Sequence, residues 1–127
     1  MPERRPFQYA VLRVVPSVER GERINVGVVL YCRQHRFLEL RAEIDEDRLH
    51  ALAPGLDPAP VRSRLAALCA VVQGAPEGGA LAELPASERF GWLVAPSSTI
   101  LQPGEVHTGM TDDPAATLTK LFATLVG

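Results

Sequence analysis

Residues 9–32, YAVLRVVPSVERGERINVGVVLYC, contain two apolar runs rich in β-branched residues, with a charged loop between them. The second run is largely apolar on both of its alternating faces, which is typical of a strand that is buried on two sides. The loop, residues 16–23, is shorter than the crossover of about a dozen residues that parallel strands require. We therefore predict an antiparallel pair in which the second strand is central.

A third strand and two longer helices are predicted after this segment. Residues 37–44 alternate between apolar and polar from Leu38 onward, so this strand covers the core on one side and lies near a sheet edge. Helices are indicated at Asp57-Pro58 and at Asp113-Pro114, because each cap-and-proline pair precedes an apolar stripe of helical spacing. Residues 75–86, rich in Gly, Pro and Ala, predict a loop.

The C-terminal part of the chain predicts a second set of strands. Gln102-Pro-Gly-Glu105 is typical of a tight turn, with strands over residues 98–102 and 105–110 on either side. The predicted fold class is α+β: an antiparallel sheet, made of an N-terminal three-stranded meander and a C-terminal hairpin, with helices packed on one face. No repeat or change in composition divides the 127 residues, so we expect a single domain over residues 1–127.

Composition and charge argue against several classes of protein. With 46% apolar and 22% charged residues, the chain has the balance of a globular protein, and a net charge of −2 argues against a nucleic-acid partner. The sequence shows neither a signal peptide nor a run of roughly 18 apolar residues, so we expect a cytoplasmic protein without a membrane segment. Since no Cys or His pair has zinc-ligand spacing, we expect no metal and no cofactor.

Two blocks of the sequence resemble the signature of a known family. The first is RGERINVGVVL at residues 20–30, and the second comprises FGWLVAP at residues 90–96, Gln102-Pro103, VHTG at residues 106–109 and Asp113-Pro114. Together they resemble a family of small bacterial proteins described only as a domain of unknown function. The resemblance implies a protein partner. This partner is a kinase of the toxin type, because a gene for such a kinase often lies beside the genes of family members. The sequence is also compatible with a homo-oligomer.

The candidate site joins the charged loop to the predicted hairpin. Asn25 is a polar residue at the start of a buried strand, where an amide costs stability unless it is paired. Binding residues gather on loops held by a rigid sheet, and two polar clusters cannot lie far apart in a domain with a radius of gyration of about 14 Å. We therefore predict one ligand- or partner-binding surface formed by Glu22, Arg23, Asn25, Ser98, Gln102 and His107. Alternatively, the Asn25 side chain only forms hydrogen bonds with backbone groups of the loop, and the charged side chains of the loop are simply solvated.

Two functions fit these residues. The first is a small cytoplasmic binding or accessory module that acts through a protein partner. The second is a small hydrolase or phosphate-ester enzyme built on Glu22, Asn25 and His107, although the sequence has neither a nucleophile-elbow nor a P-loop motif. A concave site joining the loop to His107 would favour the enzyme, whereas an exposed apolar patch without a deep pocket would favour the module.

Overall fold

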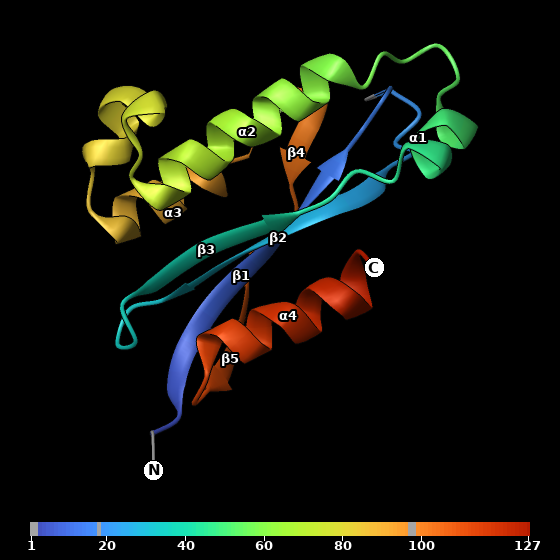
Figure 1. The fold of residues 1–127 in the computed structure, drawn as a ribbon. Coiled ribbons are helices and arrows are strands. Elements are labelled where there is room, and N and C mark those ends of the chain that lie inside the picture. The colour runs from blue at the N-terminus through green and yellow to red at the C-terminus, as the bar shows by residue number, and fades with distance from the viewer. Residues whose placement is uncertain (1–2, 18, 97–98) are drawn as a thin grey trace.

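The computed structural model describes residues 3–17, 19–96 and 99–127. In these residues one antiparallel sheet holds five strands, which are β1 (Arg5–Val14), β2 (Ile24–Cys32), β3 (Phe37–Ala42), β4 (Leu101–Pro103) and β5 (His107–Thr111). The order across the sheet is β3-β2-β1, and β4 and β5 both pair with the remaining edge of β1 (Figure 1). The α+β class, the antiparallel meander and the interior position of β2 are thus confirmed.

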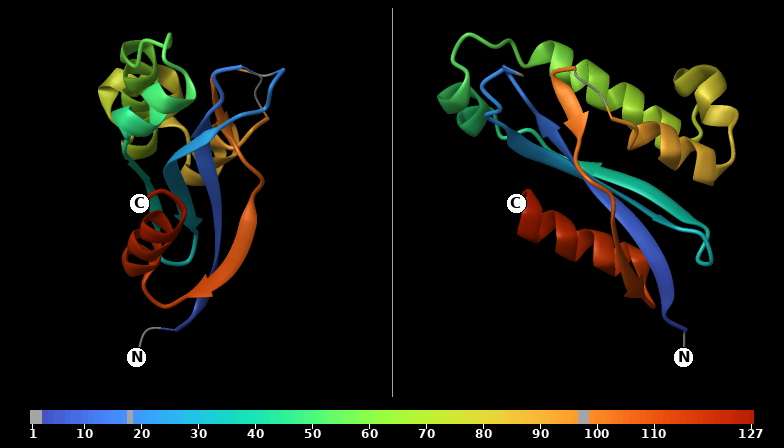
Figure 2. Two further views of the ribbon diagram at one scale, coloured as in Figure 1. Left: turned by 90° about the vertical axis from the view of Figure 1, so that its right-hand side faces the viewer. Right: turned by 180° about the vertical axis from the view of Figure 1, so that it is seen from behind.

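β4 and β5 do not form a hairpin with each other, so this detail of the prediction is wrong. β4 pairs with residues 12–14 of β1 and β5 with residues 5–9, so the two short strands follow one another along one edge (Figure 2). The physical reason is the length of β1. Its ten residues would otherwise present a long row of unpaired backbone groups, and both short strands satisfy part of that row.

Helices cover both faces of the sheet, not one face as predicted. One face carries α2 and α3, the opposite face carries α4, and α1 lies at the end of the sheet near the start of β2 (Figure 1). The reason lies in β1 and β2, whose side chains are apolar on both faces and therefore need a layer on each side. The helices are α1 (Glu46–Leu52), α2 (Ala59–Gln73), the 3₁₀ helix η1 (Pro76–Glu83), α3 (Ala86–Leu93) and α4 (Pro114–Leu125).

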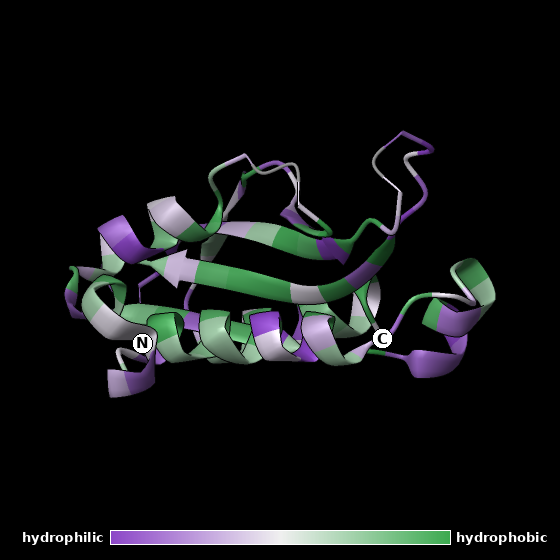
Figure 3. Ribbon diagram, turned by 90° about the horizontal axis from the view of Figure 1, so that it is seen from above, coloured by the Kyte–Doolittle hydropathy of each residue, from purple (hydrophilic) through white to green (hydrophobic). Residues whose placement is uncertain are grey.

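The sheet therefore separates two apolar cores. Figure 3 shows long hydrophobic stretches along the strands, whereas the helix that runs alongside them mixes hydrophobic and hydrophilic residues. We call the clusters the α2-side core and the α4-side core. The first includes Ala10, Leu12, Val14, Val26, Val29, Leu65, Leu68, Phe90 and Leu93. The second includes Phe7, Val28, Leu30, Cys32, Leu118 and Phe122.

A β-bulge in β2 divides its side chains between the two cores. Leu12 pairs with Gly27 and Arg13 pairs with Asn25, so Val26 is an extra residue on β2. As a result Val26 faces the α2-side core, like Val29, whereas Val28 faces the α4-side core. The side chains of β2 therefore alternate between the two faces only on either side of the bulge.

Local signals place the helix ends to within one residue: Asp113 is the N-cap of α4, whereas α2 has Pro58 as its N-cap and begins at Ala59. The Asp57 carboxylate accepts a hydrogen bond from the Ala59 amide at 3.0 Å, and Asp113 accepts one from the Ala116 amide at 3.1 Å. Gly74 ends α2 in the left-handed conformation, with φ of 66°. No single helix in the described ranges is long and apolar enough to cross a bilayer, and α2 and η1 together reach such a length and composition only across a 52° bend.

The loop predicted over residues 75–86 is instead largely the 3₁₀ helix η1, which packs against α2. Its small residues allow this close approach, because a Cβ at Gly78 would lie only 3.0 Å from the Val71 backbone nitrogen. Arg89 of α3 strengthens the junction. Its Nη1 donates to the carbonyl oxygens of Val71 and Val72 at 3.1 and 2.6 Å, and its Nε donates to that of Leu84 at 2.9 Å.

Candidate functional site

The register of β1 places Arg13 between two of the predicted site residues. Arg13 pairs with Asn25 of β2 on one side and with Gln102 of β4 on the other. Directly paired residues of an antiparallel sheet project to the same face, and the alternation of β1 from Phe7 puts Arg13 on the face that α4 covers. Asn25 and Gln102 are two strand spacings apart, which is about 10 Å between their Cα atoms.

The Arg13 guanidinium is held against the backbone of the β4–β5 connection. A Cβ on Gly104 would overlap its terminal nitrogen, so a larger residue there would displace the guanidinium, and the Gly104 amide donates to the Val11 carbonyl at 2.7 Å. Arg13 Nε is buried and has no hydrogen-bond partner among the described residues. Burial lowers the pKa of Arg13, the positive charge of Arg23 lowers it further, and the negative charge of Glu105 opposes both effects.

Asn25 has a structural partner on α4. Its Nδ2 donates to the Leu125 carbonyl at 3.0 Å, and Arg48 Nη1 approaches the neighbouring Val126 carbonyl at 3.4 Å. The last carbonyl groups of a helix lack partners within the helix, so both side chains stabilise its C-terminal end. A cavity of about 120 Å³ lies beside Asn25 and Arg48.

The other residues of the predicted site are less closely associated with Arg13 and Asn25. Glu22 forms an ion pair with Arg20 inside the loop. His107 pairs with Tyr9, their rings 5.2 Å apart, and Tyr9 lies four residues before Arg13 on β1. This shift of about 13 Å along the strand, together with two strand spacings, puts the Cα atoms of Asn25 and His107 about 16 Å apart. Ser98 lies outside the described residues.

The register thus gathers Asn25 and Gln102 at Arg13, and Arg23 is close enough to affect the pKa of Arg13. Arg13 itself was missed by the sequence analysis. The available signal was a charged residue in the middle of the apolar run of residues 9–15. A charged residue in such a position is usually a solvated side chain on an exposed strand face, so the signal is weak.

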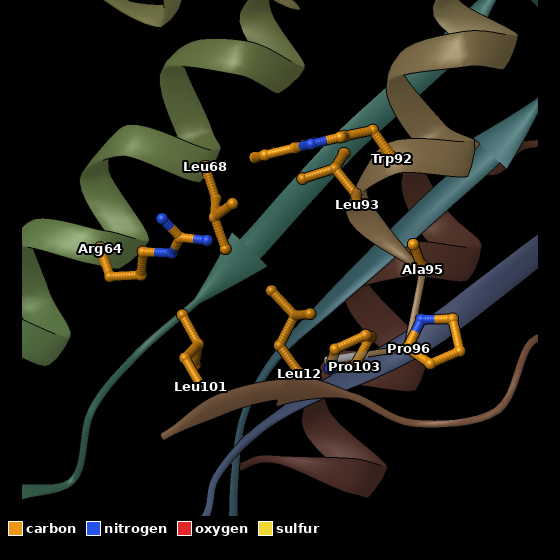
Figure 4. A pocket seen from close by; sticks show the side chains of 9 residues that line it. All are labelled: Leu12, Arg64, Leu68, Trp92, Leu93, Ala95, Pro96, Leu101 and Pro103. Carbon is orange, nitrogen blue, oxygen red and sulfur yellow. The ribbon is translucent and has the colours of Figure 1, made fainter. Parts of the chain in front are cut away.

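A second candidate site lies on the opposite face of the sheet, between α2, α3 and β4. It is a groove of about 200 Å³ in which Arg64 and Trp92 stand on opposite sides of an apolar floor (Figure 4). Trp92 is 38% exposed, whereas its neighbour Leu93 is buried. We call this the Trp92 groove, and its lining residues are Leu12, Arg64, Leu68, Trp92, Leu93, Ala95, Pro96, Leu101 and Pro103.

Sequence reasoning did not assign a role to Trp92 or Arg64. The resemblance had included Trp92, but only as part of the FGWLVAP block. A stronger signal was present in the helical spacing of α3, because Phe90 and Leu93 form its buried stripe and leave Trp92 off that stripe. A large aromatic residue outside the apolar stripe of a short helix is a candidate contact residue.

The described residues show little sign of nucleophilic or metal chemistry. No three of their His, Cys, Asp or Glu side chains lie close enough together to hold a metal ion. Burial raises the pKa of the Cys69 thiol above its ordinary value of 9.0, so this thiol is protonated at neutral pH. Cys32 is fully buried in the α4-side core, with its Sγ 3.4 Å from the Pro6 carbonyl oxygen.

A family model described as "Protein of unknown function (DUF3037)" matches residues 9–126. The chain belongs to the DUF3037 family. The family match covers all of the elements described above except the first four residues of β1, and it includes both the Arg13 surroundings and the Trp92 groove. No curated protein and no solved structure gives a significant match to the chain.

Proposed function

We propose that the protein is a binding module that acts through a protein partner held in the Trp92 groove. The observation that carries this proposal is the partly exposed Trp92 opposite Arg64 over an apolar floor. Tryptophan and arginine are the residues most enriched among those that dominate binding energy at protein interfaces. The volume of about 200 Å³ is below the roughly 300–1,000 Å³ of typical small-molecule pockets, and it suits one inserted side chain.

The groove also indicates the chemistry of the partner. Its floor is apolar, and Arg64 makes no ion pair in the described ranges. The complementary segment therefore carries an apolar side chain that fills the groove and a carboxylate that reaches Arg64.

The family resemblance supports a specific identity for this partner, namely a kinase of the toxin type. The proposal places both proteins in the cytoplasm, where the free Cys32 and Cys69 would stay reduced.

The test is to measure binding of the purified kinase to wild-type protein and to three variants by isothermal titration calorimetry. Trp92→Ala should weaken binding by about 30-fold or more, the loss typical of a dominant interface residue. Arg64→Glu should weaken it by reversing the charge at the groove. Met110→Ala is the matched control, because Met110 is 50% exposed on β5 and does not line the groove.

Thermal melts of all three variants should show that the fold is retained. Equal losses for Trp92→Ala and Met110→Ala would contradict a role for the groove. If the kinase does not bind the wild-type protein at all, its identification as the partner is wrong. The groove is then tested with proteins captured from the native host and purified, again by comparing the three variants.

The enzyme alternative draws less support from the structure than the binding module. A hydrolase or phosphate-ester enzyme built on Glu22, Asn25 and His107 needs these side chains around one substrate. In the structure Asn25 binds the end of α4, Glu22 pairs with Arg20, and His107 packs against Tyr9. No observation in the described residues favours this function over the binding module.

A further inference from the structure

Arg13 and Arg23 form a cationic pair without a bound carboxylate. Arg23 comes directly before β2 and two residues before Asn25, which pairs with Arg13, and its charge is close enough to lower the pKa of Arg13. Neither guanidinium makes an ion pair or a hydrogen bond in the part of the chain that the structure describes. Arg20, in the same loop, differs because it is paired with Glu22.

The fold holds the backbone of Arg13 in place from both sides. Its strand is hydrogen-bonded on both sides, to β2 and to β4, and its guanidinium lies over Gly104. The first feature fixes the Arg13 backbone before any ligand arrives, which lowers the entropic cost of binding. The buried Nε of Arg13 has no hydrogen-bond partner among the described residues, so the protein leaves part of this guanidinium unsatisfied.

Bringing two like charges together is unfavourable unless an anion shares them. Glu105 is the carboxylate that acts on Arg13 most directly, yet it forms no ion pair with either arginine in the described ranges. One glutamate also cannot neutralise two guanidinium groups. The site therefore has an excess positive charge.

We propose that Arg13 and Arg23 form a binding site for a phosphate dianion, next to Asn25 and Gln102. Guanidinium groups match the geometry of phosphate oxygens, and a dianion balances two arginines where a single carboxylate does not. The site lies on the α4 face of the sheet, opposite the Trp92 groove, and the inference does not depend on the proposed partner.

The test is a titration of ¹⁵N-labelled protein with inorganic phosphate, followed by amide NMR shifts at constant ionic strength. The amides of Gly104 and Gln102 should shift in a saturable way. Arg23→Gln should weaken binding at least 10-fold, and since Arg23 is exposed the variant should still fold. Arg20→Gln is the matched control and should bind like the wild type, because Arg20 is already paired with Glu22.

Two further measurements distinguish binding at this site from non-specific attraction of anions. Glu105→Gln should tighten phosphate binding, because it removes the carboxylate that competes for Arg13. Acetate, a single carboxylate, should bind more weakly than phosphate. The inference is wrong if phosphate causes no saturable shifts, if Arg20→Gln and Arg23→Gln weaken binding equally, or if acetate binds as tightly as phosphate.

Discussion

Asn25 connects two parts of the chain that are 100 positions apart. Its amide occupies the bulged end of β2, and the carbonyl that it binds belongs to the last turn of α4. Such a carbonyl has no partner within its own helix, so the amide satisfies a group that would otherwise depend on water. The hydrogen bond thus fixes the end of α4 to the sheet.

Replacing Asn25 by alanine should lower the free energy of unfolding by about 1–2 kcal/mol, the cost of a lost hydrogen bond together with an unsatisfied, partly buried acceptor. Urea denaturation measures the change. Gln102→Ala is the control, because among the described residues the Gln102 amide donates only to the nearby Thr99 carbonyl at 2.7 Å, and we expect less than about 0.5 kcal/mol. Equal effects of the two substitutions would show that the contact of Asn25 with α4 adds nothing to the free energy of unfolding.

Single residues limit what sequence alone can predict. The position of Asn25 in a buried strand indicated that its amide needed a partner, but a backbone carbonyl has no sequence signature, so the partner could not be named. The same holds for Arg13, whose surroundings come from Gly104 and Arg23 in other segments. Interactions that depend on backbone position or long-range register are visible only once the strands are paired.

At the scale of secondary structure, the predictions that hold are those with local causes. Both Asp-Pro pairs and Gly74 mark helix ends through hydrogen bonds or backbone angles within a few residues. The predicted hairpin failed because Gln102-Pro-Gly-Glu105 constrains only the local chain direction. Whether the flanking strands pair with each other or with β1 depends on the edge that β1 offers.

Gly27 gives a prediction at this scale, because it lies at the bulge where β3 approaches β2 closely. A Cβ there would lie 3.1 Å from both the Ala42 Cβ and the Arg41 carbonyl oxygen. We therefore expect Gly27→Ala to lower the free energy of unfolding by about 1–3 kcal/mol through overpacking. Chemical denaturation of the variant measures this loss.

Gly55→Ala is the matched control, since no atom lies within 4 Å of the Cβ that it would add. It should be neutral or slightly stabilising, because alanine restricts the unfolded chain. A Gly27→Ala variant as stable as Gly55→Ala would mean that β2 and β3 can move apart at no cost.

At the scale of the whole molecule, β1 and β2 contribute side chains to both cores. Sequence analysis had recognised that β2 is buried on two sides, and this observation already requires a layer on each side of the sheet. The prediction of helices on one face did not follow from it. Periodicity shows that a helix has an apolar stripe, but it does not show which face of a distant sheet the stripe will cover.

The shared strands predict that both cores unfold together. Leu65→Ala, in the α2-side core, and Phe122→Ala, in the α4-side core, should each lower the stability by about 2–5 kcal/mol. Both should keep one cooperative transition, with circular dichroism and tryptophan fluorescence giving the same midpoint. Separate transitions for the two probes in either variant would show that the cores are independent, and residues 1–127 would then not be a single folding unit.

The position of β1 in the sheet also matters during biosynthesis. β1 is made first, but the strands that complete its second edge begin at Leu101, 87 positions after Val14. At about 5–20 residues per second, a ribosome needs roughly 4–17 s to deliver them. Throughout this interval the nascent meander has an open edge along β1 and an uncovered face where α4 will pack. The chain is therefore most exposed to aggregation and to chaperone binding while it is being translated.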